Sequence, residues 1–318
     1  MEEMKTVETS DTQIKLRYQC PSCDRSLDCI ATGWYCAFEN IIFKGSQGIL
    51  NFIIPQRREK ISEFLKVYQS IRRYENWGGS ELDYYRSLPY EDKSNKHTNI
   101  WKVRAKSFAY LLDDINLRYS KSKALILDLG AGNCWLALRL AHCNHHIVAV
   151  DLNTDEYDGL GVLSRFPTGE VANIIPIQAD FHRLPFQKNN FDIVVFNGSL
   201  HYASDIPTLV ENTMKFLKHS GILYVVDTPL YTNPISGQRM IQDRLKEFKQ
   251  KYRLQLDNEF IGSYLTTDML HRLSDQFIVT VHQSNTFFSS IRKMFLSLWL
   301  GREAAAFAVI KIQHLQRG

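Results

Sequence analysis

The chain has 318 residues, of which 44% are hydrophobic and 23% are charged, and these proportions are ordinary for a soluble globular protein. They exclude a disordered chain and a collagen-like repeat as descriptions of the whole. Basic residues exceed acidic residues by only four, which is too weak a balance for a dedicated nucleic-acid binder. The length allows one large domain and one small domain.

The N-terminus is acidic and polar, and it lacks the basic and then apolar layout of a secretory signal. No apolar run reaches the roughly 18 residues of a membrane span. We therefore expect a cytoplasmic protein with no membrane partner. Six cysteines are too few for a disulfide scaffold, but four of them cluster, which favours a metal site: Cys20, Cys23, Cys29 and Cys36.

The first 120 residues contain a β-rich segment and two helices. Short apolar runs separated by Gly, Pro, Ser and Asn predict a small β-rich module over residues 18–54. Apolar residues at three- and four-residue steps predict an amphipathic helix over 56–77, with many basic residues on its other sides, and a second helix over 100–119. A polar, aromatic linker, 78–99, joins the two helices.

Apolar runs alternate with helical patterns in the rest of the chain, and this alternation predicts a parallel, doubly wound α/β sheet. The five runs are ALILDL at 124, HIVAVD at 146, NIIPIQAD at 173, FDIVVFN at 191 and GILYVVD at 221. Two later runs, 277–281 and 307–312, are expected to pair as an antiparallel hairpin around a helical insertion, 289–300. The sheet should therefore have seven strands.

The segment LILDLGAGNCW, which begins at Leu125, has the pattern of a strand, a glycine turn and a helix. Glycine lets the backbone turn sharply beside a ligand, and the helix N-terminus that follows offers unpaired N–H groups. Asp151 follows Asp128 by 23 residues, at the end of the next strand, where a carboxylate can bind both ribose hydroxyls of a nucleoside cofactor. A dinucleotide loop requires glycine at the position of Trp135, so NAD is disfavoured.

The pattern D-x-G-x-G-x-C resembles motif I of class I S-adenosylmethionine (SAM) dependent methyltransferases, with Cys134 in place of the usual third glycine. The stretch IQADFHRLPFQKNNFDIVVFNGSLHY, from Ile177, is similar to the same family, and the resemblance covers residues 123 to about 230. It implies a Rossmann-like seven-stranded sheet. It also implies these cofactor-binding residues: Asp128, Gly130, Gly132, Asp151 (ribose), Leu152 (one face of adenine), Asp180 (adenine amino group), Phe181 (backbone N–H to the adenine ring) and Asn197.

The acceptor should lie beyond the carboxyl ends of the fourth and fifth strands, at 197–202 and 227–231. His201 is the best-placed base for removing an acceptor proton, but a histidine that only fixes the loop fits equally well. Asp227 either orients the acceptor or caps the turn before Thr228. The stretch ELDYYRSLPYED, from Glu81, resembles the aromatic lid of such enzymes, in which Tyr85 would cover the cofactor, and a packed linker is the alternative.

The cysteine segment resembles the N-terminal zinc ribbon of bacterial large-subunit rRNA guanine-N1 methyltransferases. Cys20, Cys23 and Cys36 have knuckle-like spacing, but Asn40 stands where that family has its histidine ligand. Cys29 is the favoured fourth zinc ligand, and Glu39 is the other choice. A degenerate ribbon without metal is the alternative.

The sequence is compatible with three functions. The first is methyl transfer from SAM to a small molecule; the second is rRNA guanine methylation, which the basic helix at 57–73 favours; the third is SAM binding without methyl transfer. The expected domains are a zinc-ribbon-like module at 1–55, a helical linker and lid at 56–122, and the methyltransferase domain at 123–318.

Overall fold

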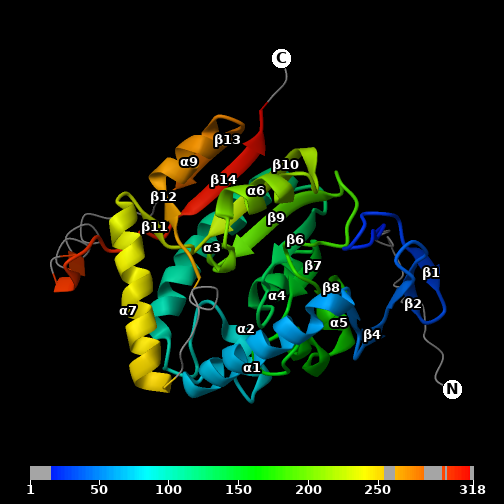
Figure 1. Ribbon diagram of the computed structural model, residues 1–318, viewed down its shortest axis with the longest axis horizontal. Coiled ribbons are helices and arrows are strands. Elements are labelled where there is room, and N and C mark those ends of the chain that lie inside the picture. Colours follow the sequence, from blue (N-terminus) through cyan, green and yellow to red (C-terminus); the bar gives the residue numbers. More distant parts are fainter. Residues whose placement is uncertain (1–15, 254–261, 283–295, 298, 316–318) are drawn as a thin grey trace. The chain divides into compact units, whose positions relative to one another are not determined.

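A computed structural model describes residues 16–253, 262–282, 296–297 and 299–315 of the chain (Figure 1). The described residues fall into two compact units, which are divided after Arg86, Ser122 and Phe191. The fold is mixed α/β and Rossmann-like, as the sequence predicts. None of the helices in these ranges combines the length and apolar character that crossing a membrane requires.

The first unit is organised around neighbouring strands in the order β6-β7-β8-β5-β4. Their bounds are β4 (Gly45–Ser46), β5 (Ile49–Asn51), β6 (Leu125–Leu129), β7 (His146–Asp151) and β8 (Ile174–Gln178). Strands β6, β7, β8 and β5 run parallel, with Asp128 opposite Ala149 and Asp151 opposite Gln178. β6 and β7 are almost continuously apolar and buried, as is typical of parallel strands covered on both faces.

The first unit contains the helix predicted over 56–77 and the helix predicted after the glycine turn, and residues 82–87, predicted as part of a linker, are also helical. Their bounds are η1 (Pro55–Arg57), α1 (Arg58–Tyr74), α2 (Leu82–Ser87), α4 (Trp135–His142), η2 (Leu160–Arg165) and α5 (Thr168–Val171). α4 starts directly after the glycine turn and packs against β7 and β8. α1 confirms the amphipathic helix predicted over 56–77, although only its Ile61 is fully buried.

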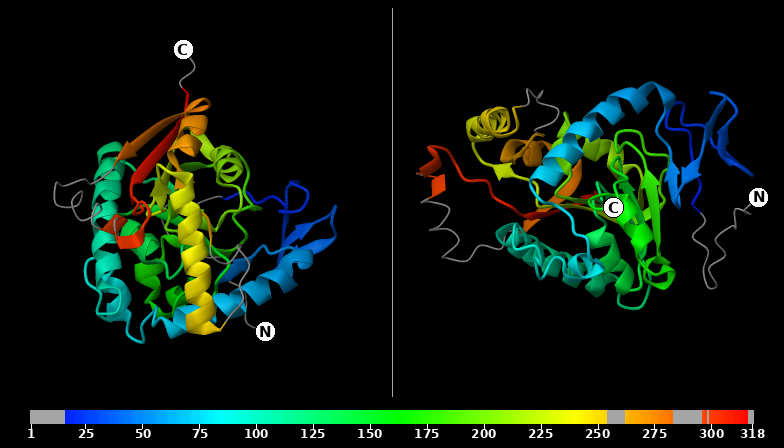
Figure 2. Two further views of the ribbon diagram at one scale, coloured as in Figure 1. Left: turned by 60° about the vertical axis from the view of Figure 1, so that its left-hand side comes forward. Right: turned by 90° about the horizontal axis from the view of Figure 1, so that it is seen from below.

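The N-terminal β-rich segment divides between two sheets. β1 (Asp28–Ile30), β2 (Gly33–Cys36) and β3 (Ile41–Phe43) form a small antiparallel sheet. The next hairpin, β4–β5, instead joins the main strands of the first unit, because β5 pairs parallel with β8. The blue N-terminal segment in Figure 2 therefore continues into the same unit as α1.

The second unit contains neighbouring strands in the order β13-β14-β10-β9 and a short parallel pair, β11–β12. The strand bounds are β9 (Phe191–Asn197), β10 (Leu217–Val226), β11 (Leu230–Tyr231), β12 (Leu265–Thr266), β13 (Phe277–His282) and β14 (Val309–His314). β14 runs antiparallel to both β10 and β13, which confirms the predicted closing hairpin. All seven strands expected from the sequence are present. The predicted insertion at 289–300 lies largely outside the described residues.

Helices of the second unit are fixed at their N-termini and against the strands. Their bounds are α3 (Thr98–Tyr119), η3 (Leu200–Tyr202), α6 (Ile206–Met214), α7 (Pro234–Tyr252) and α9 (Thr267–Ser274). Asp205, Asn233 and Thr266 cap α6, α7 and α9 by accepting backbone N–H groups. On α3, Asp114 accepts from Lys311 Nζ at 2.9 Å and from the Tyr224 hydroxyl, which ties the helix to β14 and β10.

Candidate functional site

The turn after β6 has a backbone that suits close approach by a ligand. Gly130 and Gly132 have φ of 75° and 54°, in the left-handed region that glycine adopts without strain. A Cβ built on Gly132 meets no atom within 4 Å, so this part of the turn faces open space. Cys134 also has a positive φ, 61°, which explains why the methyltransferase pattern usually has glycine at this position.

Asp128 is a buried carboxylate that lacks a hydrogen-bond partner. The residue is 1% exposed, and neither carboxylate oxygen has a hydrogen-bond partner among the residues that the structure describes. Burial, with the nearby charge of Asp151 as the smaller cause, raises the pKa of Asp128 to about 8. A buried acceptor without a partner is costly, so this position is suited to a ligand that brings a positive charge or a hydrogen-bond donor.

Asp151 links the glycine turn to the end of β7. Its Oδ2 accepts the N–H of Gly132 at 2.7 Å, and its Oδ1 accepts the N–H of Asn153 at 2.7 Å. Burial raises the pKa of Asp151, and these two N–H groups oppose that increase. The carboxylate is therefore held in a fixed orientation beside the turn.

Residues of α1, which the sequence reasoning did not connect with the site, organise the loop after β7. Arg72 donates to both oxygens of Asp158, and Gln69 donates to Asn153 Oδ1 at 2.8 Å. Arg73 lies 2.8 Å from a carboxylate oxygen of Asp155. The signal for these contacts was the acidic run after β7 together with the basic run on α1, but their pairing is a tertiary feature.

Asp180 and Phe181 follow the end of β8 in the first unit. Asp180 has an ion-pair partner that the sequence did not indicate. Asp180 Oδ2 lies 2.7 Å from Arg57 Nη2, and its Oδ1 accepts the N–H of His182 at 2.9 Å. Leu152 is the residue expected to cover adenine, and its carbonyl accepts a hydrogen bond from Gln178 Nε2 at 2.9 Å. The predicted adenine residues thus lie on loops that other first-unit residues hold.

Tyr85 has a different environment from that of a lid over a cofactor. It is 1% exposed, and its hydroxyl lies 2.8 Å from the Gly79 carbonyl and 2.6 Å from the Tyr157 carbonyl. Arg165 donates to the same hydroxyl at 3.2 Å. These contacts favour the packed-linker alternative, because the hydroxyl binds the chain itself.

The end of β9 in the second unit carries Asn197, Gly198 and His201. Asn197 is half-buried, and the N–H of Gly198 donates to the Val226 carbonyl at 2.8 Å. The Arg104 guanidinium lies 3.6 Å from the place where a Cβ on Gly198 would stand. This strand end therefore lies against α3.

His201 is packed under a neighbouring loop. Its carbonyl accepts the N–H of Ser263 at 2.5 Å, and a Cβ on Gly262 would lie 2.9 Å from the imidazole Cδ2. Burial, followed by the positive charges of Arg244 and Arg104, lowers the pKa of His201 to about 3. The imidazole is neutral at pH 7, but it is a weak proton acceptor.

Asp227 lies directly after β10 and has φ of 54°, an unusual backbone conformation for a residue other than glycine. Its Oδ1 accepts the Ser107 hydroxyl at 2.7 Å, whereas its buried Oδ2 has no hydrogen-bond partner within the described part of the chain. Burial raises the pKa of Asp227, and the Ser107 hydrogen bond and the Arg104 charge oppose that increase. Asp227 therefore combines a strained backbone, a free oxygen and an increased proton affinity.

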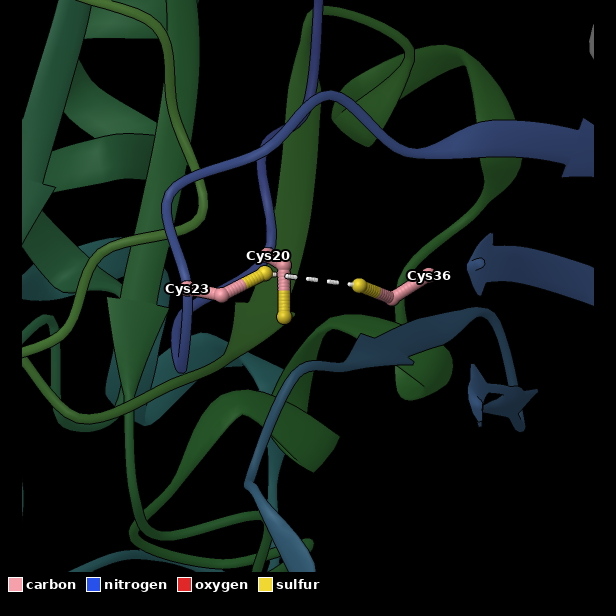
Figure 3. Close-up of side chains that lie close together, drawn as sticks. All are labelled: Cys20, Cys23 and Cys36. Atoms are coloured by element: carbon pink, nitrogen blue, oxygen red, sulfur yellow. Dashed lines mark hydrogen bonds between the residues drawn. The ribbon is translucent and has the colours of Figure 1, made fainter. Parts of the chain in front are cut away.

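Three of the four clustered cysteines come together. The sulfur atoms of Cys20, Cys23 and Cys36 lie within 4.8 Å of one another (Figure 3). Cys29, the predicted fourth ligand, is exposed on β1 and is not one of this group. It pairs with Trp34 in the β1–β2 hairpin, where Cys36 comes two residues later on the opposite strand.

Backbone N–H groups surround the thiols of this cluster. Burial raises the pKa of Cys20, and the N–H groups of Ser22 and Cys23 oppose that increase. Burial also disfavours the Cys36 thiolate, but the N–H of Glu39 and the neighbouring thiols outweigh it, so the pKa of Cys36 is lowered. Three converging sulfurs with N–H support are the kind of site that structural zinc uses.

Comparisons with known proteins agree with these features over part of the chain. Residues 127–225 match a family described as a methyltransferase domain. The rat (Rattus norvegicus) "Arginine-hydroxylase NDUFAF5, mitochondrial" is 30% identical over 125 residues, which are 36% of this chain and 34% of that protein. The "Ubiquinone/menaquinone biosynthesis C-methyltransferase UbiE" of Pseudomonas putida is 24% identical over 170 residues, which are 48% of this chain and 66% of that enzyme.

The chain thus spans about a third of the length of the NDUFAF5 proteins that it matches. Among solved structures, the YcgJ protein from a Bacillus species aligns with a TM-score of 0.43 and 18% identity, over 61% of this chain and 93% of that one. The PH0226 protein from Pyrococcus horikoshii aligns with a TM-score of 0.44 and 17% identity, over 74% and 100%. The methyltransferase resemblance inferred from the sequence is confirmed for residues 127–225.

Proposed function

We propose that this chain is a SAM-dependent methyltransferase that acts on a small-molecule acceptor. The observation that carries the proposal is the buried carboxylate of Asp128, which precedes the glycine turn, lies near Asp151 and has no hydrogen-bond partner among the described residues. SAM brings an ammonium and a sulfonium, and a cation relieves the cost of burying this carboxylate. The pyrophosphate of a dinucleotide offers this carboxyl neither a positive charge nor a hydrogen-bond donor.

The other cofactor contacts follow from the first unit. Asp151 accepts hydrogen bonds from the ribose hydroxyls, while Gly130 and Gly132 let the methionine end approach the backbone. Asp180 accepts from the adenine amino group, the N–H of Phe181 donates to the adenine ring, and Leu152 covers one of its faces. When bound, SAM supplies an activated methyl group.

The proposed proton acceptor is a residue of the second unit. Asp227 takes the acceptor proton, because its Oδ2 has no partner and its pKa is raised. This reverses the ranking from the sequence, in which His201 came first. The lowered pKa of His201 makes it a poor base, and its contacts with Gly262 and Ser263 support the loop-fixing role.

A small molecule is a better acceptor than RNA on the charges of the first unit. Arg57, Arg72 and Arg73, three of the basic residues that suggested RNA, form ion pairs with Asp180, Asp158 and Asp155. They are therefore not a continuous surface for phosphates. RNA has no support among the relatives named above, and UbiE is by name an enzyme of quinone biosynthesis.

Zinc in the thiol cluster completes the proposal. Cys20, Cys23 and Cys36 are three ligands, and Glu39 replaces Cys29 as the proposed fourth. Glu39 follows Cys36 by the same spacing as Cys23 follows Cys20, and its N–H already contacts Cys36 Sγ at 3.5 Å. A carboxylate oxygen is an accepted zinc donor, unlike the amide of Asn40.

The test begins with calorimetric titration of the purified chain with SAM and with S-adenosylhomocysteine. Radiolabelled SAM is then incubated with small-molecule extracts, total RNA and a protein extract. Label in a small molecule supports the proposal, and label in RNA or protein changes the acceptor class. SAM binding with no labelled product favours a protein that binds the cofactor without transferring its methyl group. The NDUFAF5 relatives are named as hydroxylases and not as methyltransferases, so this candidate is included in the test.

A further inference from the structure

The loop that follows β8 is hydrogen-bonded to the N-terminal segment near both of its ends. At its start, the N–H of Phe52 donates to the Gln178 carbonyl at 2.8 Å. Near its other end, the N–H of Gln19 donates to the Pro185 carbonyl at 3.0 Å, and the N–H of Gln187 donates to the Arg17 carbonyl at 3.3 Å. The segment that carries Asp180 and Phe181 is thus fastened to residues more than 120 positions earlier in the chain.

Arg57 contacts the adenine-binding carboxylate directly. Its Nη2 lies 2.7 Å from Asp180 Oδ2, and the Asp180 side chain is only 8% exposed. Oδ1 accepts the N–H of His182, and Oδ2 lies in an ion pair with Arg57 without a hydrogen bond among the described residues, so one hydrogen bond and one ion pair orient the carboxylate before any ligand arrives. Each carboxylate oxygen retains a second lone pair for an amino group.

The position of Arg57 depends on the strand before it. Arg57 ends the short helix η1, which follows β5 after three buried residues, 52–54. β5 in turn pairs with β8, the strand that leads to Asp180. A shift of β5 therefore moves Arg57 relative to the carboxylate.

An aromatic core connects this strand to the thiol cluster. The ring of Phe52 lies 4.9 Å from Tyr18 and 5.5 Å from Phe43, and Tyr18 also contacts Trp34 at 4.7 Å and Phe186 at 6.0 Å, centroid to centroid. Tyr18 lies two residues before Cys20, and Trp34 lies two residues before Cys36 on β2. The core includes Phe186, so it also reaches the loop that follows Asp180.

We infer that Arg57 is a positioning residue for adenine recognition, and that a metal ion in the Cys20, Cys23 and Cys36 cluster sets cofactor affinity through it. This inference rests on the proposed function. The three-stranded β1–β3 sheet is too small to be secure without a bound metal, so metal loss loosens the aromatic core. The core then releases β5 and η1, and Asp180 loses the guanidinium that orients it.

The first test compares cofactor recognition in Arg57 variants. Calorimetry measures the affinity of S-adenosylhomocysteine and of S-inosylhomocysteine, in which a carbonyl replaces the adenine amino group. We expect Arg57→Gln to weaken adenosyl binding about tenfold and to reduce the preference for adenosyl over inosyl, with partial rescue by Arg57→Lys. Arg58→Gln, at an exposed neighbouring position, is the matched control and should leave both affinities unchanged.

The second test asks whether the thiol cluster acts through Arg57. Removal of zinc with a chelator should weaken adenosyl binding several-fold in the wild type, with recovery on adding zinc, but should have little further effect in Arg57→Gln. Cys23→Ser should behave like the chelated protein, whereas Cys29→Ser, outside the cluster, should behave like the wild type. Metal content is measured on protein prepared without chelator.

The outcomes separate this inference from the proposed function. No binding of S-adenosylhomocysteine by the wild type overturns both. Normal binding with an unchanged adenosyl preference in Arg57→Gln and Arg57→Lys overturns the positioning role alone. Equal weakening by chelator in the wild type and in Arg57→Gln, or zinc far below one ion per chain, overturns the metal link.

Discussion

The two units each place a buried carboxylate near the end of a central strand, and the charges around the two are opposite. Asp128 on β6 has Asp151 as its charged neighbour, and its pKa rises to about 8. Asp227 after β10 has Arg104 nearby and a hydrogen bond from Ser107, which restrain the increase in its pKa. The first environment suits a cation, and the second suits a group that gives up a proton.

We expect the largest effect on turnover from a change at Asp227, the carboxylate of the second unit. Asp227→Asn keeps the size of the side chain but removes the proton acceptor, so turnover should fall about a hundredfold or more while SAM affinity stays within about twofold. The measurement is initial rate with the acceptor found by radiolabelling, together with calorimetry. Asp275→Asn, an exposed acid of the same unit, is the control; an active Asp227→Asn enzyme contradicts the assignment.

The next effect concerns the cofactor side. Asp151→Ala removes the ribose acceptor and the anchor of the Gly132 N–H, so SAM affinity should fall at least about tenfold, because each charge-assisted hydrogen bond contributes about 1.5–3 kcal/mol. Calorimetry on the folded variant measures it. Asp83→Ala, whose side chain is 68% exposed in the wild type, should bind SAM normally. Unchanged affinity in Asp151→Ala would remove the ribose role.

The pKa of Asp128 gives a smaller and more specific effect, on stability. Between about pH 4 and pH 8 the folded chain keeps a proton that the unfolded chain has lost, because the folded pKa is the higher one. The free energy of unfolding should therefore fall as pH rises through this window, by up to about 1.4 kcal/mol per pH unit from this group. Above about pH 8 this contribution is fully lost.

Asp128→Asn removes that proton equilibrium, so its free energy of unfolding should depend less steeply on pH than that of the wild type. Urea titrations at several pH values between about 5 and 8 measure the two slopes. SAM should also flatten the wild-type slope, since the bound cation favours the ionised carboxylate. Parallel slopes for the two proteins, without SAM, would show that Asp128 is ionised throughout.

The smallest expected effect separates His201 from Asp227. An imidazole with a pKa of about 3 is a weak base, so His201→Gln should lower turnover less than about tenfold, and the pH profile should show no group titrating near 6.5 that disappears in the variant. Rate measurements across pH test this. A loss as large as that of Asp227→Asn, at normal stability, would restore His201 as the base.

Local patterns in the sequence were sufficient for the strands and for the glycine turn. Continuous apolar runs such as 146–151 bury themselves in a parallel sheet, and the spacing from Asp128 to Asp151 places two carboxylates at neighbouring strand ends. The conformation of the turn also follows from the local sequence, since Gly130 and Gly132 adopt positive φ. These features are local because a strand, a turn and a helix start are each decided within about ten residues.

Contacts between residues far apart in the sequence could not be predicted and became visible only in the tertiary structure. Arg57 and Asp180 pair because β5 joins β8, and nothing near either residue indicates that pairing. Cys29 is exposed, while Cys20, Cys23 and Cys36 converge, because the register of the β1–β2 hairpin places Cys29 opposite Trp34. The proton affinities of His201 and Asp227 were beyond the sequence for the same reason: burial and the charge of Arg104 act through space, and only the packed chain brings them together.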